Sequence, residues 1–200
     1  MAIASQHLNL AEERFRLAME VPPLFFKEHA DILSQACFAM AQRFHRGGRL
    51  MVFGTGSSVS DAQHVAVEFV HPVIVGKRAL PALALTNDAA SILGFAGREG
   101  LQDIFARQLQ LLGTSDDIAM GLTCGGNDDA VANGLAMARD MGMLTIAMHG
   151  GEPAAQGEVD YRFTVPSCDS YVIQEVQETA YHILWETVHI FFEHQGLLEG

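Results

Sequence analysis

Short apolar runs alternate along most of this chain with longer segments of helical periodicity. The apolar runs lack a regular polar alternation, which is typical of strands that are buried on both faces of a sheet. They predict five strands, at residues 49–53, 82–86, 117–122, 144–148 and 161–165.

The segments between these runs carry apolar residues every three or four positions, as amphipathic helices do. They predict helices over residues 57–69, 104–112, 128–141 and 170–194. The N-terminal part also has helical spacing, which we expect to stop at Pro22-Pro23 and to resume up to Gly47-Gly48. Strands that alternate with helices predict an α/β fold, with a parallel sheet covered on both faces. We expect one domain over residues 1–200, with N-terminal helices over about 1–46.

In such a sheet, ligands bind beyond the carboxyl ends of the strands, so loops 54–58, 86–88 and 123–128 are the candidates. The first loop reads Gly54-Thr55-Gly56-Ser57-Ser58 and opens a helix. Its glycines admit a ligand close to the backbone, and its hydroxyls and helix N-terminus suit an anion. Val59 stands where a dinucleotide fingerprint has its third glycine, and a P-loop would need a lysine. A sugar or sugar-phosphate loop remains, or a plain turn in which Ser57 or Ser58 caps the helix.

His64 and Glu68 lie four residues apart on the helix that follows this loop. That spacing points both side chains along one helix face, where they could share a divalent metal or act as acid and base. Asp61, one turn earlier, could orient the imidazole. The alternative is an ordinary surface ion pair, or a helix histidine whose hydrogen bonds are satisfied within the fold.

The last helix carries Gln174, Glu178 and His182 at intervals of four, beside its apolar stripe. These side chains could point into a site, or they could be the polar flank of an amphipathic helix. Periodicity does not separate the two interpretations. His71, His189 and His194 fit structural or solvated positions better than catalytic ones.

The composition narrows the class of protein. Hydrophobic residues make up 49% of the chain and charged residues 18%, which excludes a disordered chain. A formal net charge of −12 disfavours binding to a nucleic-acid backbone. A low charge with much apolar surface fits a chain that buries part of its exterior in an oligomer.

The sequence also bears on compartment and redox chemistry. Cys37, Cys124 and Cys168 are scattered and form no CxxC pair, so neither a disulfide framework nor a zinc ribbon is expected. No apolar run approaches the roughly 20 residues that span a bilayer, and residues 1–7 lack the features of a signal peptide. We therefore expect a cytoplasmic protein without a membrane partner. Cys124 lies in a candidate ligand loop, and small-residue packing explains it better than nucleophilic chemistry.

Together these segments resemble the SIS (sugar isomerase) domain family, and most closely its bacterial phosphoheptose isomerases, over nearly the whole chain. The resemblance is carried by Gly54-Thr55-Gly56-Ser57-Ser58, by Asp61-Ala62-Gln63-His64 with Glu68, by Asn87-Asp88, and by Ile173-Gln174-Glu175 with His182. It implies a three-layer α/β/α sandwich around a five-stranded parallel sheet of flavodoxin-like type. It also implies a homotetramer whose active sites are shared between subunits, with the N-terminal helices packed in the oligomer.

The resemblance further implies roles for individual residues. Glu68 and His182 match the family's acid/base pair. The family's zinc ligands, in its metal-bearing members, are matched by His64, Glu68, Gln174 and His182. The sugar site is matched by Thr55, Gly56, Ser57, Asn87 and Asp88, and we add Ser58, Thr123, Cys124, Gly125, Asp128 and Gln174 as candidate substrate contacts.

The loop after the third strand departs from the family pattern, which is rich in serine and threonine and holds the substrate phosphate. Here it reads Thr123-Cys124-Gly125-Gly126-Asn127-Asp128-Asp129. Asp128 takes the place of a phosphate-binding serine, while Asn127 can cap the next helix and the two aspartates suit its positive end. Thr55 and Ser57 also replace an asparagine and a glycine, and Pro72 matches a family arginine. The catalytic residues are therefore kept, while the phosphate-binding residues are not.

We expect an aldose–ketose isomerase of the phosphoheptose type that acts through an enediol on sedoheptulose 7-phosphate or a related sugar. Glu68 would move the proton on carbon and His182 the proton on oxygen, although the reverse assignment is open. Two alternatives remain. The first is a non-catalytic SIS protein that binds a sugar phosphate or a protein partner, as replication-initiation adaptors do. The second is an isomerase for a different sugar.

Overall fold

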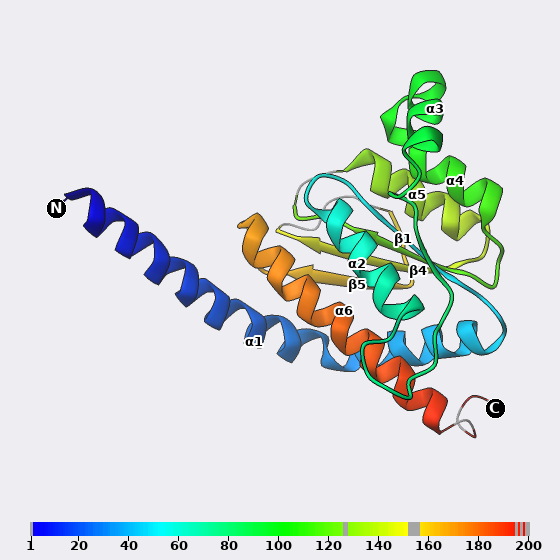
Figure 1. Cartoon of the computed structure of the whole chain (residues 1–200), viewed down its shortest axis with the longest axis horizontal. Helices are drawn as coiled ribbons and strands as arrows, with labels where there is room; N and C mark the ends of the chain where they lie inside the picture. Colours follow the sequence, from blue (N-terminus) through cyan, green and yellow to red (C-terminus); the bar gives the residue numbers. More distant parts are fainter. Residues whose placement is uncertain (1, 126–127, 152–156, 195, 197, 199–200) are drawn as a thin grey trace.

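A five-stranded sheet lies at the centre of the molecule, between two layers of helices (Figure 1). The computed structural model describes residues 2–125, 128–151, 157–194, 196 and 198. The strands are β1 (Leu50–Gly54), β2 (Ala82–Ala84), β3 (Ile118–Leu122), β4 (Leu144–Gly150) and β5 (Tyr161–Val165). All neighbouring strands pair in parallel, in the order β2-β1-β3-β4-β5. The predicted strands and the predicted α/β class are confirmed.

Six α-helices and one short 3-10 helix accompany this sheet among the described residues. They are α1 (Ala2–His45), α2 (Ser58–Val70), α3 (Ala89–Glu99), the 3-10 helix Leu101–Asp103, α4 (Ile104–Leu112), α5 (Asp129–Asp140) and α6 (Ser170–Glu193). One face of the sheet packs against α1, α2 and α6, and the other against α4 and α5. Within the described residues, none of these helices is long and apolar enough to cross a membrane.

The first helix is continuous where the sequence predicted a break, so that prediction was wrong. Pro22 and Pro23 lie inside α1 and remove two backbone donors. Val21 and Phe25, on either side of the proline pair, are nevertheless buried in the core. Burial on both sides stabilises one helix axis through the prolines. The N-terminal half of α1 projects away from the sheet, while the C-terminal half runs beneath α6 (Figure 1).

Helix α3 was missed by the sequence analysis. None of its side chains is fully buried, and its short apolar stripe, Ile92, Phe95 and Ala96, packs only partly against the core that faces α4 and α5. Its N-terminus is instead fixed by Asp88, whose carboxylate accepts hydrogen bonds from the backbone N–H groups of Ala90 and Ser91 at 3.0 and 3.1 Å. A helix held by its cap rather than by burial gives only a weak periodic signal.

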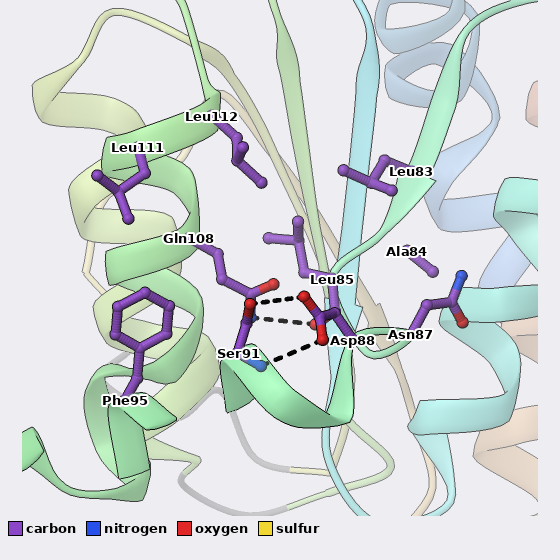
Figure 2. Close-up of a pocket in the computed structure, with 10 residues that line it drawn as sticks. All are labelled: Leu83, Ala84, Leu85, Asn87, Asp88, Ser91, Phe95, Gln108, Leu111 and Leu112. Carbon is purple, nitrogen blue, oxygen red and sulfur yellow. Dashed lines mark hydrogen bonds between the residues drawn. The ribbon is translucent and has the colours of Figure 1, made fainter. Parts of the chain in front are cut away.

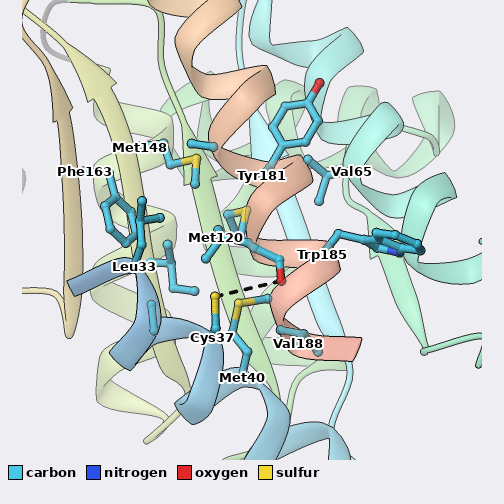
Figure 3. Close-up of a cluster of buried hydrophobic side chains, with 14 of the residues drawn as sticks. Leu33, Cys37, Met40, Val65, Met120, Met148, Phe163, Tyr181, Trp185 and Val188 are labelled. Carbon is cyan, nitrogen blue, oxygen red and sulfur yellow. Dashed lines mark hydrogen bonds between the residues drawn. The ribbon is translucent and has the colours of Figure 1, made fainter. Parts of the chain in front are cut away.

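The larger core cluster lies between the sheet and the layer of α1, α2 and α6 (Figure 3). Met120 and Met148 come from the sheet, Leu33 from α1 and Val65 from α2. Because side chains alternate along a strand, the neighbouring residues point into the second cluster, where Phe53 packs against Phe105 of α4 with ring centroids 5.1 Å apart. Both faces of the sheet are therefore dry, which explains the uninterrupted apolar runs.

The outer edge of β5 is covered by a side chain of α1. The backbone N–H of Thr164 donates to His29 Nε2 at 3.3 Å. His29 Nδ1 lies 2.9 Å from the carbonyl oxygen of Phe25. These partners require the neutral imidazole with its proton on Nδ1, because Nε2 must accept.

A buried carboxylate ties the N-terminal ends of β1 and β3 together. Asp117 accepts hydrogen bonds from the backbone N–H of Arg49 at 2.7 Å, from its guanidinium at 3.0 Å, and from the backbone N–H of Thr114 at 2.9 Å. Burial alone would raise the pKa of Asp117, but these hydrogen bonds and the Arg49 charge outweigh it and hold the pKa below its usual value.

This lowered pKa makes the protein less stable in acid. A carboxyl with a depressed folded-state pKa stabilises the fold above its unfolded pKa of about 4, and this contribution is lost as the pH falls through the folded pKa. We expect Asp117→Asn to lower the free energy of unfolding by about 2 kcal/mol at pH 7 and by less below pH 4. Urea unfolding at both pH values measures this difference. Asp116→Asn, at the exposed neighbouring position, is the control. An equal loss at both pH values would contradict the assignment.

Candidate functional site

The candidate site begins where the strand order reverses. β1 is the first strand, and its two neighbours β2 and β3 lie on opposite sides of it, so the loops after β1 and β3 diverge from adjacent strand ends. Thr55 in the first loop donates a hydrogen bond to the carboxylate of Asp128 in the second. Ser58 Oγ lies 3.3 Å from Cys124 Sγ, which also joins the two loops. The sequence placed both loops at one edge of the sheet, and these contacts confirm that placement.

The backbone of the first loop turns at Gly56, which has a φ of +58° that favours glycine. Helix α2 then starts without a side-chain cap, since Ser57 at its N-cap makes no such hydrogen bond. The predicted cap by Ser57 or Ser58 is therefore wrong. Ser58 is buried against Cys124, while Ser57 stays exposed.

Helix α2 presents His64 and Glu68 along one face, as their spacing predicted. His64 Nε2 lies 3.4 Å from Glu68 Oε1, and His182 Nε2 of α6 lies 3.3 Å from the same oxygen. The carboxylate of Glu68 thus lies beside two imidazoles from different helices. The sequence predicted the pair on α2 and the histidine on α6 separately, and the fold brings all three together.

The position of Glu68 is fixed by a neighbour on α6. Its backbone carbonyl has no helical donor four residues later, because that residue is Pro72. The indole N–H of Trp185 donates to this carbonyl at 2.9 Å instead. Trp185 is itself buried in the core, so the site and the core share one side chain.

Gln174 and Asp61 form a second link between the two helices. The amide nitrogen of Gln174 lies 3.0 Å from both carboxylate oxygens of Asp61. Burial raises the pKa of Asp61; the hydrogen bond from Gln174 opposes this shift, and the charge of Glu178 adds to it. The sequence predicted that Asp61 orients His64. This was wrong, because the Asp61 carboxylate accepts its hydrogen bonds from Gln174.

The residue that contacts the free side of the His64 ring is Tyr181, which the sequence analysis did not single out. Its hydroxyl lies 2.9 Å from His64 Nδ1. Burial, and then the carboxylates of Glu178, Asp61 and Glu68, raise the pKa of Tyr181, so the hydroxyl keeps its proton and can donate it to the ring. In the sequence, Tyr181 lies next to the apolar stripe of α6, so the pattern marks it as a core residue and gives no sign of a polar contact.

A group of possible metal ligands lies at the same place. His64, Glu178 and His182 each offer a ligand atom, and these atoms lie within 4.8 Å of one another. Glu178 Oε1 is 3.6 Å from His64 Nδ1. The sequence analysis noted Glu178 on the polar stripe of α6 but gave it no role. The only available signal was its spacing, four residues before His182.

In the loop after β3, the carboxylate of Asp128 accepts the hydrogen bonds that a ligand anion could otherwise accept. Asp128 caps α5, where it accepts a hydrogen bond from the backbone N–H of Val131 at 3.1 Å as well as the one from Thr55. The predicted internal satisfaction of the α5 dipole is thus confirmed. Thr123 is buried with its hydroxyl unpartnered, and Gln177 donates to its carbonyl at 2.8 Å. Gly125 turns with a φ of +133°. Gly126 and the predicted cap Asn127 lie outside the described residues.

Asn87 and Asp88, also predicted for the sugar site, point in different directions (Figure 2). The Asp88 carboxylate faces Ser91, whose hydroxyl donates to it at 2.6 Å, and lines a cavity of about 260 Å³ between β2, α3 and α4. Asn87 also lines this cavity, but in Figure 2 its side chain points away from Ser91, to which the Asp88 carboxylate is hydrogen-bonded. The structure therefore assigns Asp88 to the cap of α3.

The sequence of this chain is similar to those of known sugar isomerases. The model of the SIS domain matches residues 20–150. The phosphoheptose isomerase of Solidesulfovibrio magneticus is 38% identical over 84% of this chain and 83% of its own length. That of Thermodesulfovibrio yellowstonii is 36% identical over 91% of this chain and 94% of its own length.

A solved structure gives the same result. The phosphoheptose isomerase of Francisella tularensis superposes with a TM-score of 0.83 at 30% identity, over 90% of this chain and 97% of that one. The possible metal ligands on α2 and α6 are consistent with these relatives. The chain therefore belongs to the SIS domain family and, within it, to the phosphoheptose isomerases.

Proposed function

We propose that the protein is an aldose–ketose isomerase that acts on a phosphoheptose or a closely related sugar. The observation that carries this proposal is the position of Glu68, with Oε1 3.4 Å from His64 Nε2 and 3.3 Å from His182 Nε2. The relatives named phosphoheptose isomerase, together with this constellation, support catalysis over a binding role alone.

The reaction requires two proton transfers, which the two sides of this cluster can share. Conversion of a 2-ketose to a 2-aldose moves a proton between C1 and C2 through an enediol, and a second proton moves between the two oxygens. Glu68 serves as the group that takes the proton from carbon and returns it. His182 serves as the group that shuttles the proton on oxygen. Since Glu68 Oε1 and His182 Nε2 lie 3.3 Å apart, one sugar can present a carbon to the carboxylate and the oxygen on that carbon to the imidazole.

The donor set also suits a zinc ion. Two imidazoles with a neighbouring carboxylate are ligands that Zn²⁺ binds in catalytic sites. His64 and His182 would hold the ion, with a carboxylate of the same cluster. Bound there, a divalent cation supplies positive charge beside the oxygen that becomes negative during the reaction.

The carboxylates of Asp128, in loop 123–128, and of Asp129 favour a second candidate substrate. This is a ketose that carries no phosphate on the end that would lie against α5. A cavity of about 460 Å³ is lined by Thr55, Asp128 and Asp129, and by residues 101, 102, 104 and 130. The lining residues include two carboxylates and no lysine or arginine. A phosphate dianion placed there would meet like charge instead of the free N–H groups that it prefers.

Asp128→Ser separates the two substrates. Serine can still cap α5, but the negative charge is gone. We expect the variant to bind sedoheptulose 7-phosphate about tenfold more tightly in calorimetry, the size expected for removing one unit charge near a dianion. Binding of unphosphorylated sedoheptulose should change much less. Asp140→Asn, which removes an exposed charge at the far end of α5, serves as control. If Asp128→Ser does not improve phosphosugar binding, the unphosphorylated candidate loses its motive.

We further propose that the protein is a cytoplasmic homotetramer in which α1 forms much of the contact. Leu10, Phe15, Met19 and Leu24 of this helix are exposed apolar side chains on the half that projects from the sheet. Large exposed apolar groups that follow one helix are typical of a surface that another chain covers. The active site would then be shared between subunits, and residues 1–200 would form one SIS domain.

The proposal is tested by isomerisation of sedoheptulose 7-phosphate and of sedoheptulose by the purified, zinc-loaded protein. Formation of the aldose from either ketose supports the isomerase. If a folded, metal-bound oligomer converts neither sugar, the proposal is overturned and a binding role takes its place.

A further inference from the structure

The cavity between β2, α3 and α4 shares no residue with the acid–base cluster on α2 and α6 (Figure 2). It has a volume of about 260 Å³, and most of its walls are apolar. The apolar side chains are those of Leu83, Leu85, Phe95, Leu111 and Leu112. An apolar cavity of about 150 Å³ can hold a benzene ring, so this cavity has room for a ring with a short polar substituent.

The polar groups at one end of this cavity have used the hydrogens that they could donate. The amide nitrogen of Gln108 donates to the carbonyls of Leu85 and Ile104, each at 3.1 Å. The hydroxyl of Ser91 donates its one hydrogen to the Asp88 carboxylate at 2.6 Å. These side chains therefore offer the cavity an amide oxygen, hydroxyl lone pairs and a carboxylate, all of which accept hydrogen bonds. A ligand that binds at this end has to be a donor.

Charge narrows the class of ligand further. Hydrogen bonds from the Ser91 hydroxyl, and from the backbone N–H groups of Ser91 and Ala90, hold the pKa of Asp88 below its usual value. Asp88 is thus ionised at neutral pH. Among the described residues that line the cavity, none is a lysine or an arginine. A negative charge beside acceptor oxygens favours a ligand with a positive donor group and disfavours a carboxylate or a phosphate.

We propose that this cavity is a second ligand site, for a small organic ammonium ion. The apolar body of the ion packs against the leucines and Phe95, and its NH₃⁺ group donates to Asp88 and Gln108. The site takes a ligand of the opposite charge to a sugar phosphate, and it does not depend on the isomerase activity proposed above. Because α3 has no fully buried side chain, a ligand packed against Phe95 also stabilises that helix.

Binding of the 2-phenylethylammonium ion tests the assignment. The full-length protein is titrated with this ion in a calorimeter, and separately with phenylacetate, which has the same ring and the opposite charge. We expect a dissociation constant of about 0.1–1 mM for the ammonium ion, and binding of phenylacetate that is at least about tenfold weaker. When the ammonium ion is bound, hydrogen–deuterium exchange should slow in α3 and change little along α2 and α6, which carry the acid–base cluster.

Two variants place the ligand in the cavity. Asp88→Asn removes the charge but keeps a side chain that caps α3, and Phe95→Ala removes one apolar wall. Each should weaken binding of the ammonium ion about tenfold. The matched controls are Asp140→Asn, an exposed carboxyl on α5, and Leu93→Ala, an exposed apolar residue of α3 that does not line the cavity. Both controls should bind the ion like the wild type.

The assignment is overturned if the ammonium ion binds no more tightly than phenylacetate, or if either Asp88→Asn or Phe95→Ala binds it like the wild type. A wild-type protein that takes up no ammonium ion at millimolar concentration overturns it as well. Each of these outcomes leaves the isomerase proposal standing, because none involves the residues of the acid–base cluster. Circular dichroism of each variant establishes folding, and Phe95→Leu replaces Phe95→Ala should the latter not fold.

Discussion

Glu68→Gln should lower kcat for ketose–aldose interconversion by two to four orders of magnitude, which is about the contribution of one positioned acid–base group. Glutamine keeps the size and the polar contacts of the side chain but cannot accept the proton from carbon. His182→Ala should cause a loss of similar size. Coupled assays of aldose formation measure both losses.

Exchange with solvent deuterium separates the two roles. If Glu68 acts on carbon, Glu68→Gln loses incorporation of deuterium at C1 or C2, whereas His182→Ala retains some exchange while it interconverts the sugars slowly. The opposite pattern would assign the carbon proton to His182. Glu175→Gln, an exposed change on the same helix, should leave kcat unchanged. Full activity in Glu68→Gln would exclude the glutamate from the chemistry altogether.

The largest loss of stability among the site's neighbours is expected for Trp185→Ala. The indole is buried at 5% exposure, packs against His189 with ring centroids 4.4 Å apart, and donates to the carbonyl of Glu68. Removing a buried aromatic ring costs about 3–5 kcal/mol, which for a chain of this length lowers Tm by about 6–20 °C. Differential scanning calorimetry measures the shift.

Trp185→Phe isolates the hydrogen bond from the packing. The phenyl ring fills most of the space, but the carbonyl of Glu68 loses its donor, since Pro72 cannot supply one. We expect a loss of about 1–2 kcal/mol, together with a reduced kcat, because the backbone that carries Glu68 is no longer fixed. Equal losses of stability in both variants would show that the hydrogen bond, rather than the ring, dominates.

The sheet could be predicted from sequence because its strands are buried on both faces. Runs such as Leu50–Gly54 and Ile118–Leu122 have every residue buried, so hydrophobicity alone marks them. The signals failed where burial and local chemistry disagree. Pro22 and Pro23 break a helix on local grounds, yet Val21 and Phe25 are buried on either side and the helix continues. Helix α3 buries no side chain fully, and its stripe of Ile92, Phe95 and Ala96 is too short to mark a helix by itself.

For the site, sequence spacing predicted which residues share a helix face but not what they face across the fold. The four-residue interval put His64 beside Glu68, and this is confirmed. The pairing of Asp61 with Gln174, 113 residues apart, depends on how α2 packs against α6. Tyr181 and Glu178 were overlooked for opposite reasons. The tyrosine follows an apolar stripe and the glutamate a polar one, so neither stands out until the helices are side by side.

His29, which covers the outer edge of β5, protects the sheet against the addition of a strand from another chain. An edge strand with free N–H groups is a template onto which another chain can add a strand. Here the N–H of Thr164 is taken by Nε2 of His29, so the side chain that packs α1 against the sheet also blocks the addition of a strand at this position of β5.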